Sequence, residues 1–151
     1  MEFQDAERMD EDRVRRYWDK INLVLKRSDE ICTWTAIQPK DFIQDEKTKL
    51  ATYKAFQEIV EACMDIIAMM CKDSKIPPRD DYTNIGLLKD RIPFEDMEQT
   101  LIEANGLINR LVHRYNSTDD LLAFESIREI VPRISKVIEG VKEWIRQTLG
   151  E

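Results

Sequence analysis

Residues 120–149 read DLLAFESIREIVPRISKVIEGVKEWIRQTL. Apolar residues recur here at spacings of three and four, the period of a helix that buries one face. The period continues beyond Pro132, so we expect this proline to kink one helix without ending it. Ser117, Thr118 and Asp119 supply capping oxygens just before it. The predicted inner stripe comprises Leu121, Phe124, Ile127, Val131, Ile134, Ile138, Val141 and Ile145.

The same period marks three segments upstream, over about 13–35, 45–72 and 95–116. The predicted inner stripe of the first is Val14, Tyr17, Ile21, Val24, Ser28, Ile31 and Thr35. That of the second is Leu50, Tyr53, Phe56, Val60, Cys63, Ile67 and Met70. That of the third is Met97, Leu101, Ala104, Leu107 or Ile108, Leu111 and Val112. No stretch alternates apolar and polar residues, so we predict an all-α fold, an antiparallel up-and-down four-helix bundle.

Prolines mark the connections between these helices. Pro39 either ends the first helix or starts a short turn that carries Asp41 and Phe42. Residues 73–93 hold three more prolines and one short periodic piece near 83–89, with Thr83 as its predicted N-cap. We therefore expect a crossover with a short extra helix between the second and third long helices. Pro93 suits the first turn of the third.

The composition describes a single domain. With 151 residues, 42% hydrophobic and 35% charged, the chain has only four glycines and five prolines, too few for a linker-rich protein. We predict one helical domain over 13–151 and a flexible acidic N-terminus over 1–12. A domain of this size buries about 70% of its unfolded surface, so it needs no disulfide or metal to be stable.

Cysteine usage and hydropathy bear on the compartment. Cys32, Cys63 and Cys71 form no C-x-x-C pair and lie in or near apolar stripes, which predicts reduced, buried thiols and a cytoplasmic protein. Neither a signal peptide nor a run of eighteen apolar residues is present, so we expect no membrane partner. The net charge of -7 disfavours broad, charge-driven binding of nucleic acid but is compatible with a local basic patch.

The chemistry-bearing stretch is 106–116, GLINRLVHRYN. It contains the only histidine of the chain, His113, between Arg110 and Arg114. Two positive charges and one titratable group at a helix end make a plausible phosphate site. The alternative is a surface histidine whose protonated form is favoured by the helix dipole.

Other clusters have simpler explanations. Glu61 and Asp65 lie four apart, but metal sites in helical bundles add Glu-x-x-His ligands, and a lone histidine placed elsewhere provides none. The methionines and cysteines of 63–71 are interpreted as gap-filling core residues. We therefore expect neither metal nor cofactor. The aromatic residues are interpreted as core or dimer interface: Tyr17, Trp18, Trp34 and Trp144.

From about Arg13 to Leu149 the chain resembles the HEPN superfamily, and within it the HepT-like proteins. The resemblance rests on the Asp41-Phe42 turn, on residues 59–62 (IVEA), on the proline-rich crossover with Tyr82 and above all on residues 106–115. The family pattern there is Arg-Asn, three residues, His, any residue, Tyr. The resemblance implies a four-helix bundle that forms a homodimer and brings the two motifs to a shared cleft.

The function implied by the resemblance is that of a metal-independent ribonuclease toxin, paired with a small nucleotidyltransferase antitoxin. The motif histidine, here His113, would act as general acid and base on RNA. The motif tyrosine, here Tyr115, would receive nucleotide from the antitoxin, and Asn109 matches the motif asparagine. The motif arginine is replaced by Ile108, which can neither donate a hydrogen bond nor offset phosphate charge.

Arg110 does not directly replace the missing arginine, because positions 108 and 110 point about 200° apart on a helix. Three readings follow. The protein is a ribonuclease that uses His113 with Arg110 or Arg114, a catalytically silent dimeric partner of a nucleotidyltransferase, or a helical dimer scaffold. Apolar residues outside the core stripes favour a dimer in all three: Trp18, Leu25 and Trp34.

Overall fold

The computed structural model of the protein describes residues 2–92, 96–113 and 119–150, with side chains described from Glu11 onward. These residues form six helices and no strand, which confirms the all-α prediction. The helices are α1 (Glu2–Trp34), α2 (Pro39–Gln44), α3 (Glu46–Asp73), α4 (Asp81–Leu88), α5 (Met97–Val112) and α6 (Asp120–Leu149). None of the described helices is long and apolar enough to cross a membrane.

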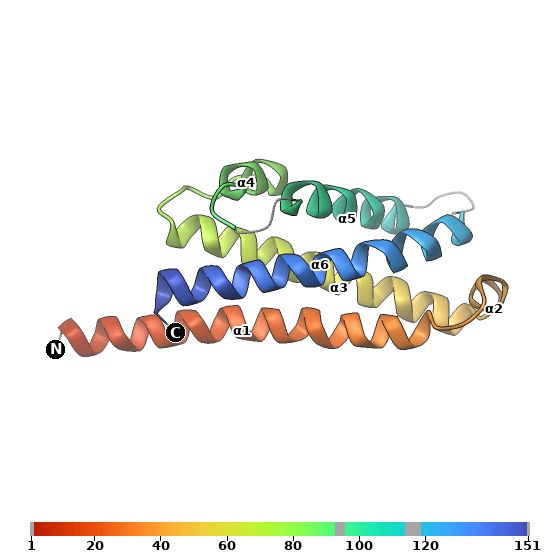
Figure 1. Ribbon diagram of the computed structural model, residues 1–151, viewed down its shortest axis with the longest axis horizontal. Helices are drawn as coiled ribbons and strands as arrows, with labels where there is room; N and C mark the ends of the chain where they lie inside the picture. The colour runs from red at the N-terminus through yellow and green to blue at the C-terminus, as the bar shows by residue number, and fades with distance from the viewer. Residues whose placement is uncertain (1, 93–95, 114–118, 151) are drawn as a thin grey trace.

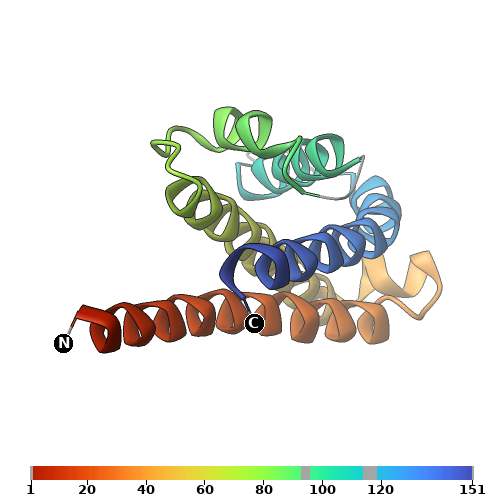
Figure 2. The ribbon, with the colours of Figure 1, turned by 60° about the vertical axis from the view of Figure 1, so that its left-hand side comes forward.

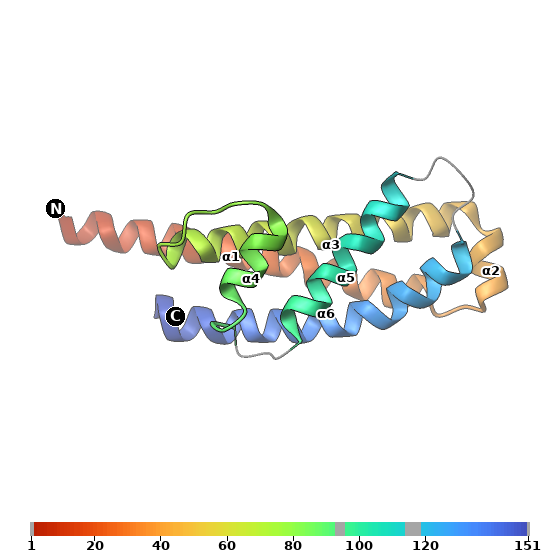
Figure 3. The ribbon, with the colours of Figure 1, turned by 90° about the horizontal axis from the view of Figure 1, so that it is seen from above.

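The four long helices α1, α3, α5 and α6 run in alternating directions (Figure 1). Viewed after a turn about the vertical axis, α3 and α6 lie between α1 on one side and α4 and α5 on the other (Figure 2). Seen from above, α5 crosses α3 and α6 obliquely, and α2 lies near the starts of α3 and α6 (Figure 3). The end of α5 therefore lies at the same end of the molecule as α2.

The buried stripes agree with the sequence pattern except near helix ends. Leu50, Val112 and Leu121 were expected inside but are 50%, 52% and 42% exposed. Each lies within the first or last turns of its helix, where a neighbouring helix no longer faces the whole stripe. Leu107 and Ile108 are both buried, because α5 contacts α3 as well as α6. Helix α6 continues through Pro132, as predicted.

Helix α1 begins at Glu2, well before the start that the apolar period predicted at Arg13. Residues 2–12 are mostly good helix formers, and a helix already nucleated over its packed part extends through such residues without an apolar face. The flexibility predicted for 1–12 stays a prediction.

The side chains of aspartates cap three of the helices. Asp45 and Asp119 cap α3 and α6, and the carboxylate of Asp119 accepts from the N–H of Leu122 at 3.0 Å. The N-cap of α4 is Asp80, which accepts from the N–H of Thr83 at 2.9 Å, so the prediction of Thr83 as the cap is wrong. An aspartate three residues before a threonine offers a stronger acceptor than the hydroxyl. Pro93 lies outside the described residues.

Pro39 is the first residue of α2, which resolves the two readings of this proline in favour of a new helical turn. Phe42 of α2 is buried, with ring centroids 4.7 Å from Phe124 and 6.1 Å from Tyr53. This aromatic contact joins α2 to α3 and α6 beneath the end of the molecule where α5 ends.

The thiols and aromatic residues are only partly as expected. Cys63 and Cys71 are buried, but Cys32 is exposed, because it lies beside the stripe of α1 rather than on it. Trp18, Leu25 and Trp34 are partly buried against the core, so they leave less apolar surface than the sequence suggested. Tyr17 packs edge-on against Trp144, with ring centroids 5.8 Å apart, as a core pair.

Candidate functional site

Two of the predicted site residues, Asn109 and Arg110, lie on the last turn of α5, and His113 directly follows the helix. Asn109, Arg110 and His113 are exposed to solvent. His113 is the C-cap of the helix, and its backbone N–H donates to the carbonyl oxygen of Asn109 at 3.0 Å. Arg114 and Tyr115, predicted as a phosphate contact and as the modification site, lie outside the described residues.

Two faces of α5 meet at Asn109. One face is turned toward α3 and carries Asn105, Ile108 and Val112, whereas Arg110 lies on the solvent side. The guanidinium of Arg110 folds back along its own helix, with Nη1 3.7 Å from where a Cβ would stand on Gly106. Ile108 is only 7% exposed, so position 108 and Arg110 face opposite ways, as their angular separation predicts.

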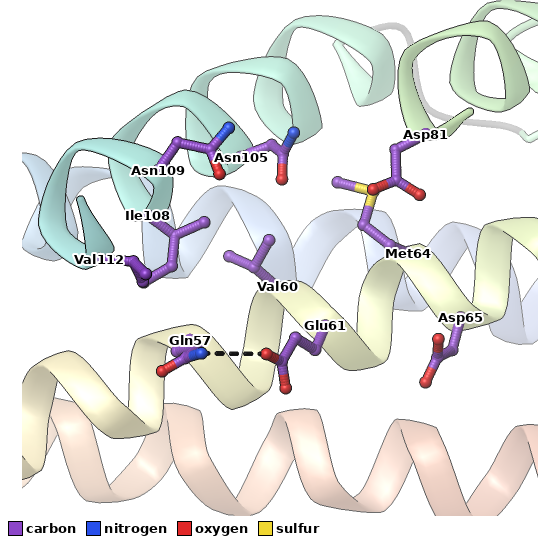
Figure 4. Close-up of a pocket in the computed structure, with 10 residues that line it drawn as sticks. All are labelled: Gln57, Val60, Glu61, Met64, Asp65, Asp81, Asn105, Ile108, Asn109 and Val112. Carbon is purple, nitrogen blue, oxygen red and sulfur yellow. Dashed lines mark hydrogen bonds between the residues drawn. The ribbon is translucent and has the colours of Figure 1, made fainter.

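A groove lies between α3 and α5, with a volume of about 320 Å³ (Figure 4). Apolar side chains form its floor: Val60, Met64, Ile108 and Val112. Polar side chains surround this floor: Gln57, Glu61 and Asp65 from α3, Asp81 from α4, and Asn105 and Asn109 from α5. We call this feature the α3–α5 groove.

Two of the carboxylates in the α3–α5 groove have partners. Glu61 accepts a hydrogen bond from Gln57 Nε2 at 3.1 Å, and Asp65 forms an ion pair with Lys20 of α1 at 2.8 Å. Within the described residues, the side chain of Asp81 has neither a hydrogen bond nor an ion pair. The groove thus has a negative lining, and an anionic phosphate is disfavoured inside it.

The solvent face of α5 is different. Arg110 and His113 lie there outside the groove, so a phosphate can approach both without entering the carboxylate-lined space. An imidazole N–H of His113 can donate a hydrogen bond to such a phosphate. Ile108, in contrast, presents only methyl groups to the groove and stabilises no charge.

The described residues contain no group of three or more His, Cys, Asp or Glu side chains that could hold a metal ion. Glu61 and Asp65, the carboxylates considered as possible ligands, are both exposed on α3 at the rim of the groove. Their spacing reflects one face of a helix.

The sequence pattern did not predict the groove as a unit. Asn109, Glu61 and Asp65 stand out separately in the sequence, but no pattern brings Asn105 or Asp81 to the same place. The available signal was the spacing of four that Gln57, Glu61 and Asp65 share on α3, repeated by Asn105 and Asn109 on α5. These two polar helix faces form one groove only if α3 and α5 pack side by side. The sequence alone does not show which helices are neighbours.

Three comparisons relate the chain to known proteins. The sequence model of the family described as ribonuclease HepT-like matches residues 21–141. A candidate RNase of Archaeoglobus fulgidus is 33% identical over 135 residues, covering 87% of this chain and 94% of the relative. A second candidate RNase of that organism is 37% identical over 108 residues, covering 71% and 76%.

A solved structure shares the fold. It is a tri-AMPylated HEPN toxin of Shewanella oneidensis in complex with MNT antitoxin. Its chain superposes with a TM-score of 0.76 and is 18% identical, covering 85% of this chain and 97% of that one.

Proposed function

Since the chain belongs to the HepT-like ribonuclease family, we propose that it is a metal-independent endoribonuclease centred on His113 and the toxin of a toxin–antitoxin pair. The observation that carries the proposal is the placement of His113. It is the exposed C-cap of α5, one turn beyond Asn109 and on the solvent face with Arg110.

The chemistry requires one proton acceptor and one proton donor. The ribose 2′-hydroxyl attacks the adjacent phosphorus and loses its proton to a base, while the 5′-oxygen leaves as its bond to phosphorus breaks and takes up a proton. The products are a 2′,3′-cyclic phosphate and a 5′-hydroxyl end. Imidazole serves either role near neutral pH, so His113 is assigned as general acid and base.

The negative charge on the phosphate must be stabilised by a cationic hydrogen-bond donor. Arg110 is assigned to this role, and Arg114 is a second candidate. Because Arg110 approaches from the opposite side to Ile108, it reaches the phosphate by a route that the family motif does not use. Asn109, whose side-chain amide is exposed beside the same turn, is assigned to contact the substrate.

A silent binding partner is the second candidate function. The observation that favours it is Ile108, which leaves the family's arginine position without a charge. In this reading the protein binds a nucleotidyltransferase without cleaving RNA, and Tyr115 remains open to modification. The likeness to a HEPN toxin bound to MNT antitoxin supports a nucleotidyltransferase partner under both readings. A dimeric helical scaffold without chemistry is the third.

We also propose a cytoplasmic homodimer of up-and-down four-helix bundles. The alternating directions of α1, α3, α5 and α6 support the bundle (Figure 1). A self-association surface at the end of the molecule where α5 ends is supported by apolar side chains that are exposed there. They lie near the starts of α3 and α6 and at the end of α5: Leu50, Val112, Leu121 and Leu122. A dimer formed by this surface brings two copies of His113 toward one cleft.

The test is incubation of the purified full-length chain with total RNA and with tRNA, with and without EDTA. Cleavage that is unchanged by EDTA supports the metal-independent enzyme. Intact RNA at high protein concentration selects the silent partner or the scaffold, and cleavage that EDTA abolishes contradicts the assignment to His113 and Arg110 alone.

A further inference from the structure

We propose that the α3–α5 groove binds a nucleobase that carries an exocyclic amino group, belonging to the nucleotide next to the phosphate at His113. The inference rests on the proposed ribonuclease function and adds a specificity site to it. Uracil, which has no amino group, is the base that the groove disfavours.

The size and composition of the α3–α5 groove suit a base. Its volume of about 320 Å³ lies at the small end of the roughly 300–1,000 Å³ found for small-molecule sites. The floor of Val60, Met64, Ile108 and Val112 offers apolar contact to a flat ring. Single-stranded RNA is read by such contact combined with hydrogen bonds to the edges of the bases.

The polar lining distinguishes one kind of edge from another. Asn105 and Asn109 each offer a donor and an acceptor, and they point out from α5 beside the floor (Figure 4). Glu61 and Asp81 add acceptors, because a carboxylate has two oxygens and the bond from Gln57 uses only one oxygen of Glu61. An amino group of cytosine, adenine or guanine brings two N–H donors to these acceptors. Uracil brings only its N3–H, which stands between two carbonyl oxygens, O2 and O4, that the carboxylates repel.

Asn109 links the α3–α5 groove to His113. Its side chain lines the groove, and its backbone carbonyl oxygen accepts a hydrogen bond from the backbone N–H of His113 at 3.0 Å. Residues four apart on a helix have Cβ atoms about 5–6 Å apart, which is the scale of one nucleotide. A base beside Asn109 therefore leaves its phosphate near His113.

Charge enforces the same orientation. Glu61, Asp65 and Asp81 disfavour phosphate in the α3–α5 groove, while Arg110 attracts it on the solvent face. The nucleotide is thus expected to enter base first. The competing occupant is a basic side chain from a partner protein, which would use the carboxylates but leave the amides of Asn105 and Asn109 unused.

Titration of the ¹⁵N-labelled full-length chain with cytidine and with uridine tests the inference. These nucleosides differ at the C4 substituent and at N3, and neither contains a phosphodiester, so binding does not depend on cleavage. We expect cytidine to shift the side-chain amide signals of Asn105 and Asn109 and to bind at least about fivefold more tightly than uridine. Equal affinities, or shifts elsewhere on the chain, overturn the inference.

Two variants and one control sharpen the result. Glu61→Gln and Asn105→Leu are expected to reduce the preference for cytidine to less than about twofold. Glu139→Gln removes an exposed carboxylate of α6 outside the groove and should leave the preference unchanged. N-acetylarginine amide is the competing probe, and its binding to the groove in place of cytidine overturns the inference.

Failure of the inference and failure of the proposed function are distinguishable. Cleavage of RNA at uridine and cytidine alike, together with absent cytidine binding, removes the base site and leaves the ribonuclease. Selective cytidine binding without RNA cleavage retains the base site and removes the catalytic assignment.

Discussion

At the scale of single residues, the contrast between Ile108 and Arg110 decides how the site can work. Ile108 is buried in the wall of the α3–α5 groove, and Arg110 lies along the solvent face of α5. Position 108, where the sequence resemblance predicts an arginine, therefore faces carboxylates rather than open solvent. A guanidinium at position 108 would share the groove with the carboxylate of Glu61, which lies on the opposite helix, α3.

Ile108→Arg is expected to raise the rate of RNA cleavage, because the long stem of an arginine can carry its guanidinium out of the α3–α5 groove toward a phosphate at His113. Loss of one hydrogen-bond donor to the charge that develops in the transition state lowers the rate by about 10²- to 10³-fold. An added donor can therefore raise the rate by no more than about that factor. Single-turnover cleavage of one RNA by wild type, Ile108→Arg and the matched apolar variant Ile108→Leu provides the measurement. A rate for Ile108→Arg no higher than that of Ile108→Leu, at equal thermal stability, would show that the position contributes nothing.

Tyr115 carries the second prediction at this scale. It follows His113 by two residues, and a nucleotidyltransferase needs an accessible hydroxyl, with cationic groups such as Arg110 and Arg114 to hold the incoming phosphates. Co-expression with a nucleotidyltransferase encoded beside this gene is expected to add one or more nucleotide masses in intact-mass spectrometry. Tyr115→Phe should remove them without altering the fold, and an added mass that persists in Tyr115→Phe argues against this residue.

At the scale of helices, the period of apolar residues located every long helix, because burial of one face at 3.6 residues per turn leaves a direct mark on the sequence. Helix ends were less predictable. Leu50, Val112 and Leu121 continue their stripes in sequence, yet they extend past the packed overlap of the helices. The sequence could not identify the N-cap of α4, because Asp80 and Thr83 are both common capping residues. Only the structure shows that Asp80 accepts the hydrogen bond and that the backbone N–H of Thr83 donates it.

Some candidate functional residues could be predicted from the sequence and others could not. His113, Asn109 and Arg110 were accessible from the motif, because a short pattern within one helix fixes their relative positions. The α3–α5 groove was not, because Asp81 and Asn105 join it only through the packing of α4 and α5 against α3. Long-range packing of this kind leaves no short-range signal in one sequence.

The aspartate caps predict how stability depends on pH. Hydrogen bonds from the backbone and hydroxyl of Thr83 lower the pKa of Asp80, and those from Thr48 lower the pKa of Asp45. A carboxyl whose pKa is lower in the folded state stabilises the fold above its unfolded pKa, near 4. This contribution is lost as the pH falls through the folded pKa.

Urea unfolding of wild type and Asp80→Asn at pH 6 and pH 3 measures this effect. The loss of stability between the two pH values should be larger for wild type, because asparagine still caps the helix but does not titrate. The double variant Asp45→Asn, Asp80→Asn should lose less again. An identical pH dependence in all three proteins would mean that the caps are not linked to protonation.

At the scale of the whole molecule, exposed apolar residues and the proposed catalytic residues lie toward one end. The starts of α3 and α6 lie near α2, and the end of α5 lies toward the same end of the molecule (Figures 1 and 3). These segments carry four exposed apolar residues: Leu50, Val112, Leu121 and Leu122. Several apolar side chains exposed at one end of a molecule are typical of an interface with another copy or partner. We expect a two-fold symmetric dimer in which each copy presents the same surface.

Multi-angle light scattering at micromolar concentration measures the assembly. The expected mass is twice the 17.9 kDa of the chain. Leu122→Glu, which places a charge among the apolar residues exposed at this end, should shift the mass toward the monomer. Leu87→Glu, at an exposed leucine of α4, is the matched control. A wild-type mass near that of one chain would refute the dimer.

The central claim, that His113 is the reactive group of a ribonuclease, is tested most directly by one rate comparison. Cleavage of a single RNA is followed for wild type and His113→Ala at equal concentration, with circular dichroism to verify that both are folded. His113 is exposed at the end of α5, so its removal should leave the fold intact while lowering the rate by at least about 10²-fold. Equal rates for the two proteins would contradict the account.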